Sequence, residues 1–271
     1  PKPVINISNA PMAITCDDNV VYWVLYTSGA TYNWSATPSA TISNPNGVWT
    51  YIDWSDDTQH GTVTLTVTYS NGCTATTTMN VAGCCIGTGA NDINIKNITA
   101  GAFVSQQLAA GNGTITGGDG TLNNPYIFTN NLGANGILYI NGVFKVDLAF
   151  TFSNSLVKMG EKARIDIPSY SGTSNQKLNV MCSDIEAGCD TMWDGIYIYP
   201  DDRVNFLYMK GDDGCTTAAT CTTHYVRDAE NAVVSVNGGG IFELYCYKYL
   251  NNYKDVWVQQ YANQHYSSGK I

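Results

Sequence analysis

The feature that most constrains the fold is a succession of very short apolar segments after Gly136, each bracketed by Gly, Asn or Asp. Short apolar runs between turn-forming residues are typical of β-strands and not of helices. We expect strands at residues 137–140, 143–146, 156–159, 163–167, 178–181, 196–198, 204–208, 233–236, 241–245 and 256–258.

These segments recur at the interval of one solenoid coil. Val234 and Val256 lie 22 positions apart (256 − 234), and Ile196 and Val234 lie 38 apart (234 − 196), which fits a coil with an insertion around Cys215 and Cys221. In a solenoid, each coil buries its apolar residues against its neighbours. We therefore expect a parallel β-solenoid over residues 137–271, preceded by a Gly- and Asn-rich linker and cap over residues 85–136.

The first third of the chain has a different pattern, in which longer strands alternate apolar and polar residues. Such strands are expected at residues 20–24, 31–35, 49–54 and 62–69. Strict alternation places one face of each strand in a core and the other in water, and several such strands in so short a segment are typical of an immunoglobulin-like sandwich. Asn71-Gly72 predicts a hairpin turn directly before Cys73. The predicted class is all-β, with a sandwich over residues 1–84.

Charge and hydropathy exclude two kinds of partner. The net charge is −9, with only 13 Lys and Arg residues in 271, so the chain lacks the basic face that nucleic acids and anionic membranes require. No apolar stretch approaches the length of about 18 residues that a membrane span needs. We expect no nucleic-acid partner and no direct membrane insertion.

Nine cysteines are many for a protein of a reducing compartment, and they predict export with disulfides. The candidate pairs are Cys16 with Cys73, Cys182 with Cys189, and Cys215 with Cys221. Cys84, Cys85 and Cys246 remain, and an odd total leaves at least one thiol free or paired outside the chain. Zinc is disfavoured because Cys84 and Cys85 are adjacent, without the usual spacer between ligands.

No catalytic motif stands out. The chain has three histidines, each isolated in sequence, and it lacks the Gly-x-Ser-x-Gly, His-Glu-x-x-His and dinucleotide patterns. Asp194 and Asp228 lie in or beside one coil with four further carboxylates, Asp201, Asp202, Asp212 and Asp213. Turn chemistry explains such residues best, but these four could also ligate calcium, and paired carboxylates could serve a glycosidase. No other cofactor is expected.

Aromatic residues offer a binding hypothesis. Rings on a flat parallel sheet can stack on sugar faces, and strand alternation turns some of them outward. The candidates for glycan stacking are Tyr197, Tyr199, Tyr208, Tyr245 and Trp257. Stacking inside the solenoid is the structural alternative for each of them.

Two family resemblances follow from specific motifs. Tyr32-Asn33-Trp34-Ser35, Ile52-Asp53-Trp54 and Asn71-Gly72-Cys73-Thr74 resemble a PKD-type domain of bacterial surface proteins. Residues 189–198, with Asp228-Ala229 and Asn251-Asn252, resemble the right-handed parallel β-helix of proteins exported by the type IX secretion system of Bacteroidota. That resemblance implies architectural roles: Trp193-Asp194-Gly195-Ile196 opens a coil, and Asp228-Ala229 and Asn251-Asn252 form turns. Asp190-Thr191-Met192 is similar to the O-glycosylation sequon of that phylum, with Thr191 as the acceptor.

These observations predict a non-catalytic extracellular protein, an adhesin or a filament-forming structural protein, whose solenoid carries a glycan-binding face. Its expected partners are copies of itself, other cell-surface proteins, or polysaccharide. A polysaccharide-degrading enzyme, a lyase or glycoside hydrolase on a β-helix, is the alternative. Pro1 in place of Met fits a processed product or a fragment, and a coil strand near Ile271 without a cap predicts further coils or a docked partner.

Overall fold

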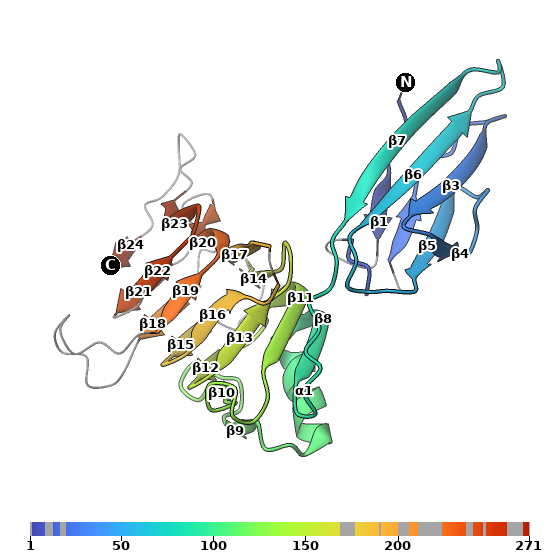
Figure 1. Ribbon diagram of the computed structural model, residues 1–271. Helices are drawn as coiled ribbons and strands as arrows, with labels where there is room; N and C mark the ends of the chain where they lie inside the picture. The colour runs from blue at the N-terminus through green and yellow to red at the C-terminus, as the bar shows by residue number, and fades with distance from the viewer. Residues whose placement is uncertain are drawn as a thin grey trace. The chain divides into compact units, whose positions relative to one another are not determined.

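The computed structural model describes residues 2–8, 13–16, 20–168, 177–189, 191–199, 206–210, 224–236, 241–245, 248–258 and 268–270. The chain divides into two compact units, Pro1–Ile86 and Gly87–Ile271. Nearly all regular structure in the described residues is β-strand, with a single short helix (Figure 1). The predicted all-β class is confirmed.

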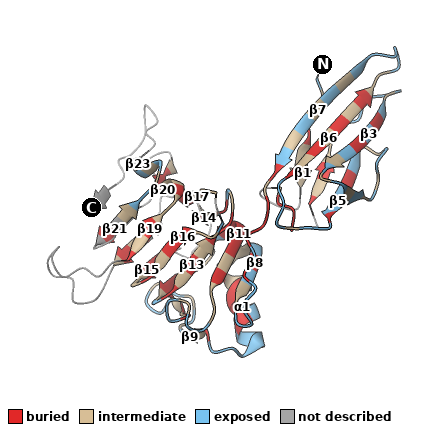
Figure 2. Cartoon of the chain, in the orientation of Figure 1, coloured by how far each residue is buried: buried red, intermediate tan, exposed pale blue. Residues whose placement is uncertain are grey.

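The first unit contains two antiparallel sheets. One has the order β1 (Asn6–Ser8), β2 (Val21–Trp23), β5 (Trp49–Trp54) and β4 (Ala40–Ile42), and the other has the order β3 (Thr31–Thr37), β6 (Gly61–Thr68) and β7 (Thr74–Val81). Alternate residues are buried along β5 and β6, as the predicted pattern requires (Figure 2). They meet in a core that includes Tyr22, Trp34, Ile52, Val63 and Leu65.

Strand β7 was not expected, because its sequence has no clear apolar alternation. Threonine nevertheless favours strands, since its β-branched side chain packs well on a pleated surface. The outward positions of β3, β6 and β7 form a threonine face, in which every residue is Thr, Ser or Asn: Thr31, Asn33, Ser35, Thr37, Thr62, Thr64, Thr66, Thr68, Thr74, Thr76, Thr78 and Asn80. The predicted turn joins β6 to β7, with Gly72 at a φ of 81°.

The expected pairing of Cys16 with Cys73 is wrong. Cys16 forms a disulfide with Cys84. Ile14 pairs with Ala82, which brings Cys16 beside Cys84, whereas the exposed Cys73 lies at the other end of β7, about 26 Å away at 3.3 Å per residue.

Only some of the remaining cysteines lie in the described residues. Cys85 and Cys189 are also disulfide-bonded. Cys182 is not bridged to Cys189, so that pairing is wrong as well. Cys215 and Cys221 lie outside the described residues. Disulfides are therefore present, but the pairings of Cys16 with Cys73 and of Cys182 with Cys189 do not hold.

The second unit is built from parallel strands that stack in successive circuits. In one sheet, the first half of β11 (Leu138–Lys145) pairs with β13 (Leu156–Met159), which is followed by β16 (Asp184–Ala187), β19 (Tyr225–Arg227) and β22 (Lys248–Leu250). The second half of β11 pairs with β14 (Arg164–Ile167), which is followed by β17 (Trp193–Ile198), β20 (Ala229–Ser235) and β23 (Lys254–Val258). The opposite edge of β11 pairs with β8 (Ile93–Thr99).

A second sheet closes each circuit. It contains β9 (Ile115–Gly117), β10 (Tyr126–Phe128), β12 (Phe150–Ser153), β15 (Lys177–Met181), β18 (Phe206–Lys210), β21 (Ile241–Tyr245) and β24 (Ser268–Lys270), and all its pairs are parallel except β9 with β10. From β13 onward the chain visits three strand positions in turn, for example β16, β17 and β18, before it returns to the first. Each circuit thus lies on the one before it.

The register of one expected pair is shifted by one residue. Val256 lies opposite Val233 and not Val234, so this circuit spans 23 positions (256 − 233), and Ile196 also lies opposite Val233. Side chains alternate between the two faces of a strand, so a shift of one residue exchanges the inner and outer residues. Val233 packs in the core cluster of the second unit, whereas Val234, although also buried, lies outside that cluster.

The segment expected to be a linker and cap holds regular structure of the second unit from β8 onward. Helix α1 (Ala100–Ala110) was not predicted from the sequence. Thr99 caps its first turn by accepting a hydrogen bond from the Ala102 N–H, and Gly111 ends it in the left-handed conformation, with φ 63°. Phe103 of α1 packs against Phe128, Phe144 and Phe150 at the β8 end of the stack.

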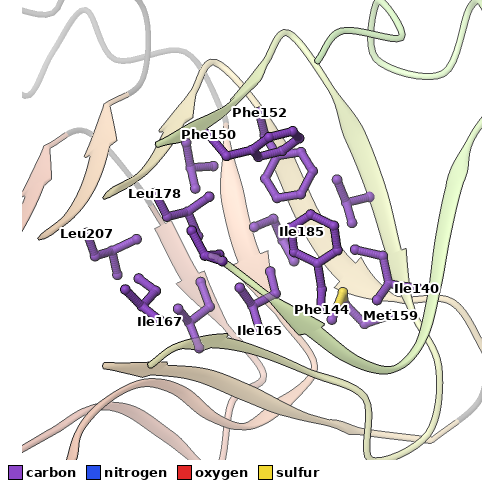
Figure 3. Close-up of a cluster of buried hydrophobic side chains, with 14 of the residues drawn as sticks. Ile140, Phe144, Phe150, Phe152, Met159, Ile165, Ile167, Leu178, Ile185 and Leu207 are labelled. Carbon is purple, nitrogen blue, oxygen red and sulfur yellow. The ribbon is translucent and has the colours of Figure 1, made fainter. Parts of the chain in front are cut away.

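The interior between the two sheets is filled by large apolar side chains, which Figure 3 shows pointing toward one another. Phe150 and Phe152 meet edge to face, with ring centres 5.0 Å apart. Residues from successive circuits continue this core, including Ile140, Phe144, Met159, Ile165, Ile167, Leu178, Ile185 and Leu207. Burial of such residues is the main stabilising contribution to this unit.

Two turns of the second unit contain Asp and Asn residues in unusual backbone conformations. Asp228 and Asn251 adopt left-handed backbone conformations, with φ 61° and 55°. Asn252 bridges two strands, because its Oδ1 accepts from the Ala229 N–H and its Nδ2 donates to the Val226 carbonyl. These residues shape the path of the chain.

Candidate functional site

The candidate site lies on the outer surface of β14, β17 and β20. Ile165, Ile196 and Val233 are in register and buried, so the residues beside them alternate to the outer face. This arrangement gathers a set that we call the tyrosine–arginine cluster: Arg164, Asp166, Asp194, Tyr197, Tyr199 and Asn231.

A close approach of two strands underlies the cluster. Gly195 in β17 has a φ of 146°, and a Cβ atom there would lie 1.6 Å from the Asn231 carbonyl oxygen. Only glycine fits this position. Asn231 is thereby brought close enough to Tyr197 for its Nδ2 to lie 3.4 Å from the hydroxyl oxygen.

Tyr197 is fixed by hydrogen bonds. Its hydroxyl donates to Asp194 Oδ1 over 2.5 Å and accepts from Asn231 Nδ2. Burial raises the pKa of Tyr197 far above its usual value, and the hydrogen bond to Asp194 raises this pKa further. The phenol therefore stays protonated near neutral pH and cannot act as a base there.

Arg164 makes two contacts within the cluster. Its Nη2 donates to Asp166 Oδ2 over 3.1 Å, and its Nε lies 3.0 Å from Asp166 Oδ1 without a hydrogen bond between these two atoms. Its guanidinium carbon also lies 5.6 Å from the centre of the Tyr197 ring. The rings of Tyr197 and Tyr199 stack with centres 6.5 Å apart and planes 27° apart.

The surroundings of Asp166 make its carboxyl less acidic than usual. Burial raises its pKa, the charge of Arg164 opposes that rise, and the nearby Asp194 carboxylate adds to it. The side chain of Asp166 is largely buried. A carboxyl that retains its proton more readily than usual, close to another carboxylate, is the kind of pair that acid catalysis uses.

The other predicted stacking residues are only partly described. Tyr208 is half-buried, and the Nζ atom of Lys177 lies 5.9 Å from its ring centre. Trp257 of β23 lies opposite Val234 of β20, and Tyr245 is the last residue of β21. The structure does not describe the side chains of Trp257 and Tyr245. Of the five residues predicted to stack on a glycan, Tyr197 and Tyr199 are in contact with each other.

Thr191, the expected glycosylation acceptor, has a buried Oγ1 atom without a hydrogen-bond partner in the structure. Because this oxygen is inaccessible in the folded chain, a glycan would have to be added before folding. The calcium candidates Asp201, Asp202, Asp212 and Asp213 lie outside the described residues. Within the described part of the chain, no group of three or more His, Cys, Asp or Glu side chains could hold a metal ion.

A second polar array was also missed by the sequence reading. On β13, β16 and β19, Glu186 forms ion pairs with both Lys158 and Arg227, which belong to the neighbouring circuits. We call these three residues the charge ladder. Nearby, His224 Nδ1 lies 3.1 Å from Asp184 Oδ1.

The missed residues share one difficulty, because their partners lie on other circuits. Arg164 and Asp166 are separated from Tyr197 by 33 and 31 positions (197 − 164 and 197 − 166). The alternation in Arg164-Ile165-Asp166-Ile167 would have shown an outward polar pair, but only the register identifies what that pair contacts.

Comparisons with protein-family models, curated proteins and solved structures found no match for this chain. None of the described helices is long and apolar enough to span a membrane. Function is therefore inferred from the arrangement of the residues above.

Proposed function

We propose that this chain belongs to an exported, non-catalytic surface protein, an adhesin or a filament-forming structural protein. Its first unit is an immunoglobulin-like sandwich of the PKD type, which serves as a spacer. Its second unit is a right-handed parallel β-helix, resembling those of type IX-secreted proteins, which serves as a stiff rod for binding or assembly. The stacked parallel circuits and the disulfides support this proposal.

One observation carries the non-catalytic character: the polar groups of the tyrosine–arginine cluster are already committed to each other. Arg164 pairs with Asp166, and Tyr197 donates to Asp194. A general acid or base must have an atom available for substrate. Groups held in such mutual contacts within β14 and within β17 stabilise the fold instead.

The same cluster also supports a glycan-binding face. Tyr197 and Tyr199 form a stacked pair of partly exposed rings, and carboxylate and amide groups surround them. Rings present apolar surface to sugar faces, while the polar groups around them can meet hydroxyls. Copies of the same chain, cell-surface proteins and polysaccharide are the proposed partners.

A polysaccharide-degrading enzyme is the second candidate, and the raised pKa of Asp166 beside Asp194 favours it. Glycoside hydrolases use two neighbouring carboxyl groups, one of which retains its proton more readily than usual. In this structure, however, Asp166 faces Arg164 and Asp194 accepts from Tyr197, so both carboxyls would have to exchange partners before reaction.

The experiment incubates the purified chain with neutral and acidic polysaccharides and measures both retention and the release of reducing ends or unsaturated products. The proposal expects retention without product. Tyr199→Ala should weaken retention, while Tyr253→Ala, which removes an exposed ring elsewhere in the second unit, should not. Product formation that Asp194→Asn abolishes would establish the enzyme and overturn the proposal.

A further inference from the structure

The first unit carries an outward face with aromatic side chains that the proposed function does not use. On β2 and β5, Tyr22 and Ile52 point into the core, so the alternate residues point outward. Trp23 lies directly opposite Trp49, and Val21 lies opposite Tyr51. The pairing continues beyond β2 through the Val24 N–H to the Val48 carbonyl, which places the next alternate residue, Leu25, on this side. We call these five residues the aromatic face: Val21, Trp23, Leu25, Trp49 and Tyr51.

The rings of this face are open to solvent. Trp49 is 46% exposed and Tyr51 is 38% exposed, and they meet edge to face with ring centres 5.7 Å apart. In the second unit, by contrast, cations lie over the rings of Tyr197, Tyr208, Tyr225 and Tyr253. Among the described residues, no cation lies over the ring of Trp49 or Tyr51 in this way. Trp49 and Tyr51 are thus available for stacking where the tyrosines of the second unit are partly occupied.

The neighbours of the aromatic face are polar and nearly uncharged. Asn6 lies opposite Trp23 and Ser8 lies opposite Val21 on the adjoining strand β1. On the other side, Thr41 lies opposite Asp53, which is the one charged residue at these register positions. Amide and hydroxyl groups beside bare rings match a neutral ligand rich in hydroxyls, and they offer no cation to an acidic one.

The size of the face distinguishes a sugar chain from a protein partner. With its flanking residues the face crosses four strands and spans about 14 Å, and the distance from Val21 to Leu25 is about 13 Å at 3.3 Å per residue. A stable protein interface buries about 800 Å² on each partner, which is several times this area. A short stretch of a single polysaccharide chain fits it.

We propose that the aromatic face of the first unit binds a neutral polysaccharide by stacking sugar rings on Trp49 and Tyr51. The polar groups of Asn6, Ser8 and Thr41 hydrogen-bond its hydroxyls. This site is independent of the tyrosine–arginine cluster, so the first unit acts as a binding module and not only as a spacer.

The test measures binding of neutral glucan, mannan and N-acetylglucosamine oligosaccharides to the whole chain by titration calorimetry, with an alginate oligosaccharide as the acidic comparison. At least one neutral probe should bind and alginate should not. Trp49→Ala should weaken that binding about tenfold, and Trp49→Phe, which keeps a ring, should retain most of it. Thr76→Ala on the threonine face and Tyr253→Ala are matched controls that should bind as the unchanged chain does.

Thermal denaturation establishes that each variant is folded, which is expected because Trp49 is half exposed. The proposal is overturned if no neutral probe binds, or if Trp49→Ala binds as well as the unchanged chain. It is also overturned if Trp49→Ala abolishes self-association of the chain, since that would identify the face as a protein interface. Binding at the tyrosine–arginine cluster is tested separately, because Tyr199→Ala changes the second unit and leaves the aromatic face of the first unit intact.

Discussion

The guanidinium of Arg164 lies over the ring of Tyr197, with 5.6 Å between the guanidinium carbon and the ring centre, although 33 positions (197 − 164) separate the two residues. The same guanidinium faces Asp166. Arg164 therefore links two neighbouring circuits, β14 and β17, through its cation–ring contact, while its ion pair with Asp166 lies within β14. This relationship makes the tyrosine–arginine cluster part of the packing between circuits of the second unit.

Arg164→Met should destabilise the chain by about 2 kcal/mol, because it leaves the largely buried Asp166 carboxyl without its cation. Arg164→Lys should cost less, since it keeps the charge and loses only the planar fork. Urea unfolding of both variants measures the difference. Equal stability of Arg164→Met and the unchanged chain would show that neither the ion pair nor the ring contact of Arg164 stabilises the fold.

Asp166 predicts an unusual pH dependence. Its pKa is raised above 3.8, so the folded chain holds a proton that the unfolded chain has already released. Because the folded state binds more protons than the unfolded state in this range, stability falls as pH rises from 3.8 through the raised pKa. Asp166→Asn removes this titration, so the stability of the unchanged chain relative to the variant should decrease over that range.

The check is urea unfolding of both proteins at several values between about pH 4 and pH 7, which spans the range where a raised carboxyl titrates. Asp147→Asn is the matched control, because it makes the same change at another carboxyl of the second unit, one whose Oδ1 accepts a hydrogen bond from the Gly101 N–H. A stability difference that stays constant, or that grows with pH, would contradict the raised pKa of Asp166.

Glu186 in the charge ladder should be more sensitive than either of its partners. Its side chain is only 4% exposed and pairs with Lys158 and Arg227 on the two adjacent circuits. Glu186→Gln removes both ion pairs and should cost about 2 kcal/mol, whereas Lys158→Met leaves the pair with Arg227 and should cost less. Chemical denaturation distinguishes the two, and a larger loss for Lys158→Met would show that Arg227 cannot hold the carboxylate alone.

The disulfide between Cys16 and Cys84 should be the main covalent support of the first unit. It closes a loop with a sequence separation of 68 residues, for which the chain-entropy estimate is about 4 kcal/mol. The double variant Cys16→Ser and Cys84→Ser should lose stability on this scale in thermal unfolding. Cys73→Ser alters an exposed thiol and should unfold like the unchanged chain. A comparable loss in Cys73→Ser would contradict the assigned pairing.

Local pattern was sufficient to predict the strands with strong apolar periodicity. Residues 156–159 and 241–245 were expected as strands, and β13 and β21 have these bounds. Strand β7 and helix α1 were missed, the first because Thr replaces the apolar residues and the second because it is short and Phe103 packs into a distant core. Local sequence does not reveal such tertiary contacts.

The candidate site was predictable only in part, for a related reason. Tyr197 and Tyr199 were among the aromatic residues expected to stack on a ligand, but Arg164 and Asn231, which contact Tyr197, come from neighbouring circuits. The register that joins circuits depends on the length of each intervening loop, and a one-residue difference moved Val233 into the place expected for Val234. The disulfide partner of Cys16 was predicted wrongly for a similar reason. The pairing of Ile14 with Ala82, which local sequence does not show, brings Cys16 to Cys84.

The most direct test of the central claim examines the natural protein in surface material from cells that make it, by intact mass spectrometry and electron microscopy together with assays of polysaccharide cleavage. The account predicts an exported protein that forms rods or filaments and releases no sugar product. A discrete, unassembled protein that degrades a polysaccharide, and that loses this activity on Asp194→Asn, would contradict it.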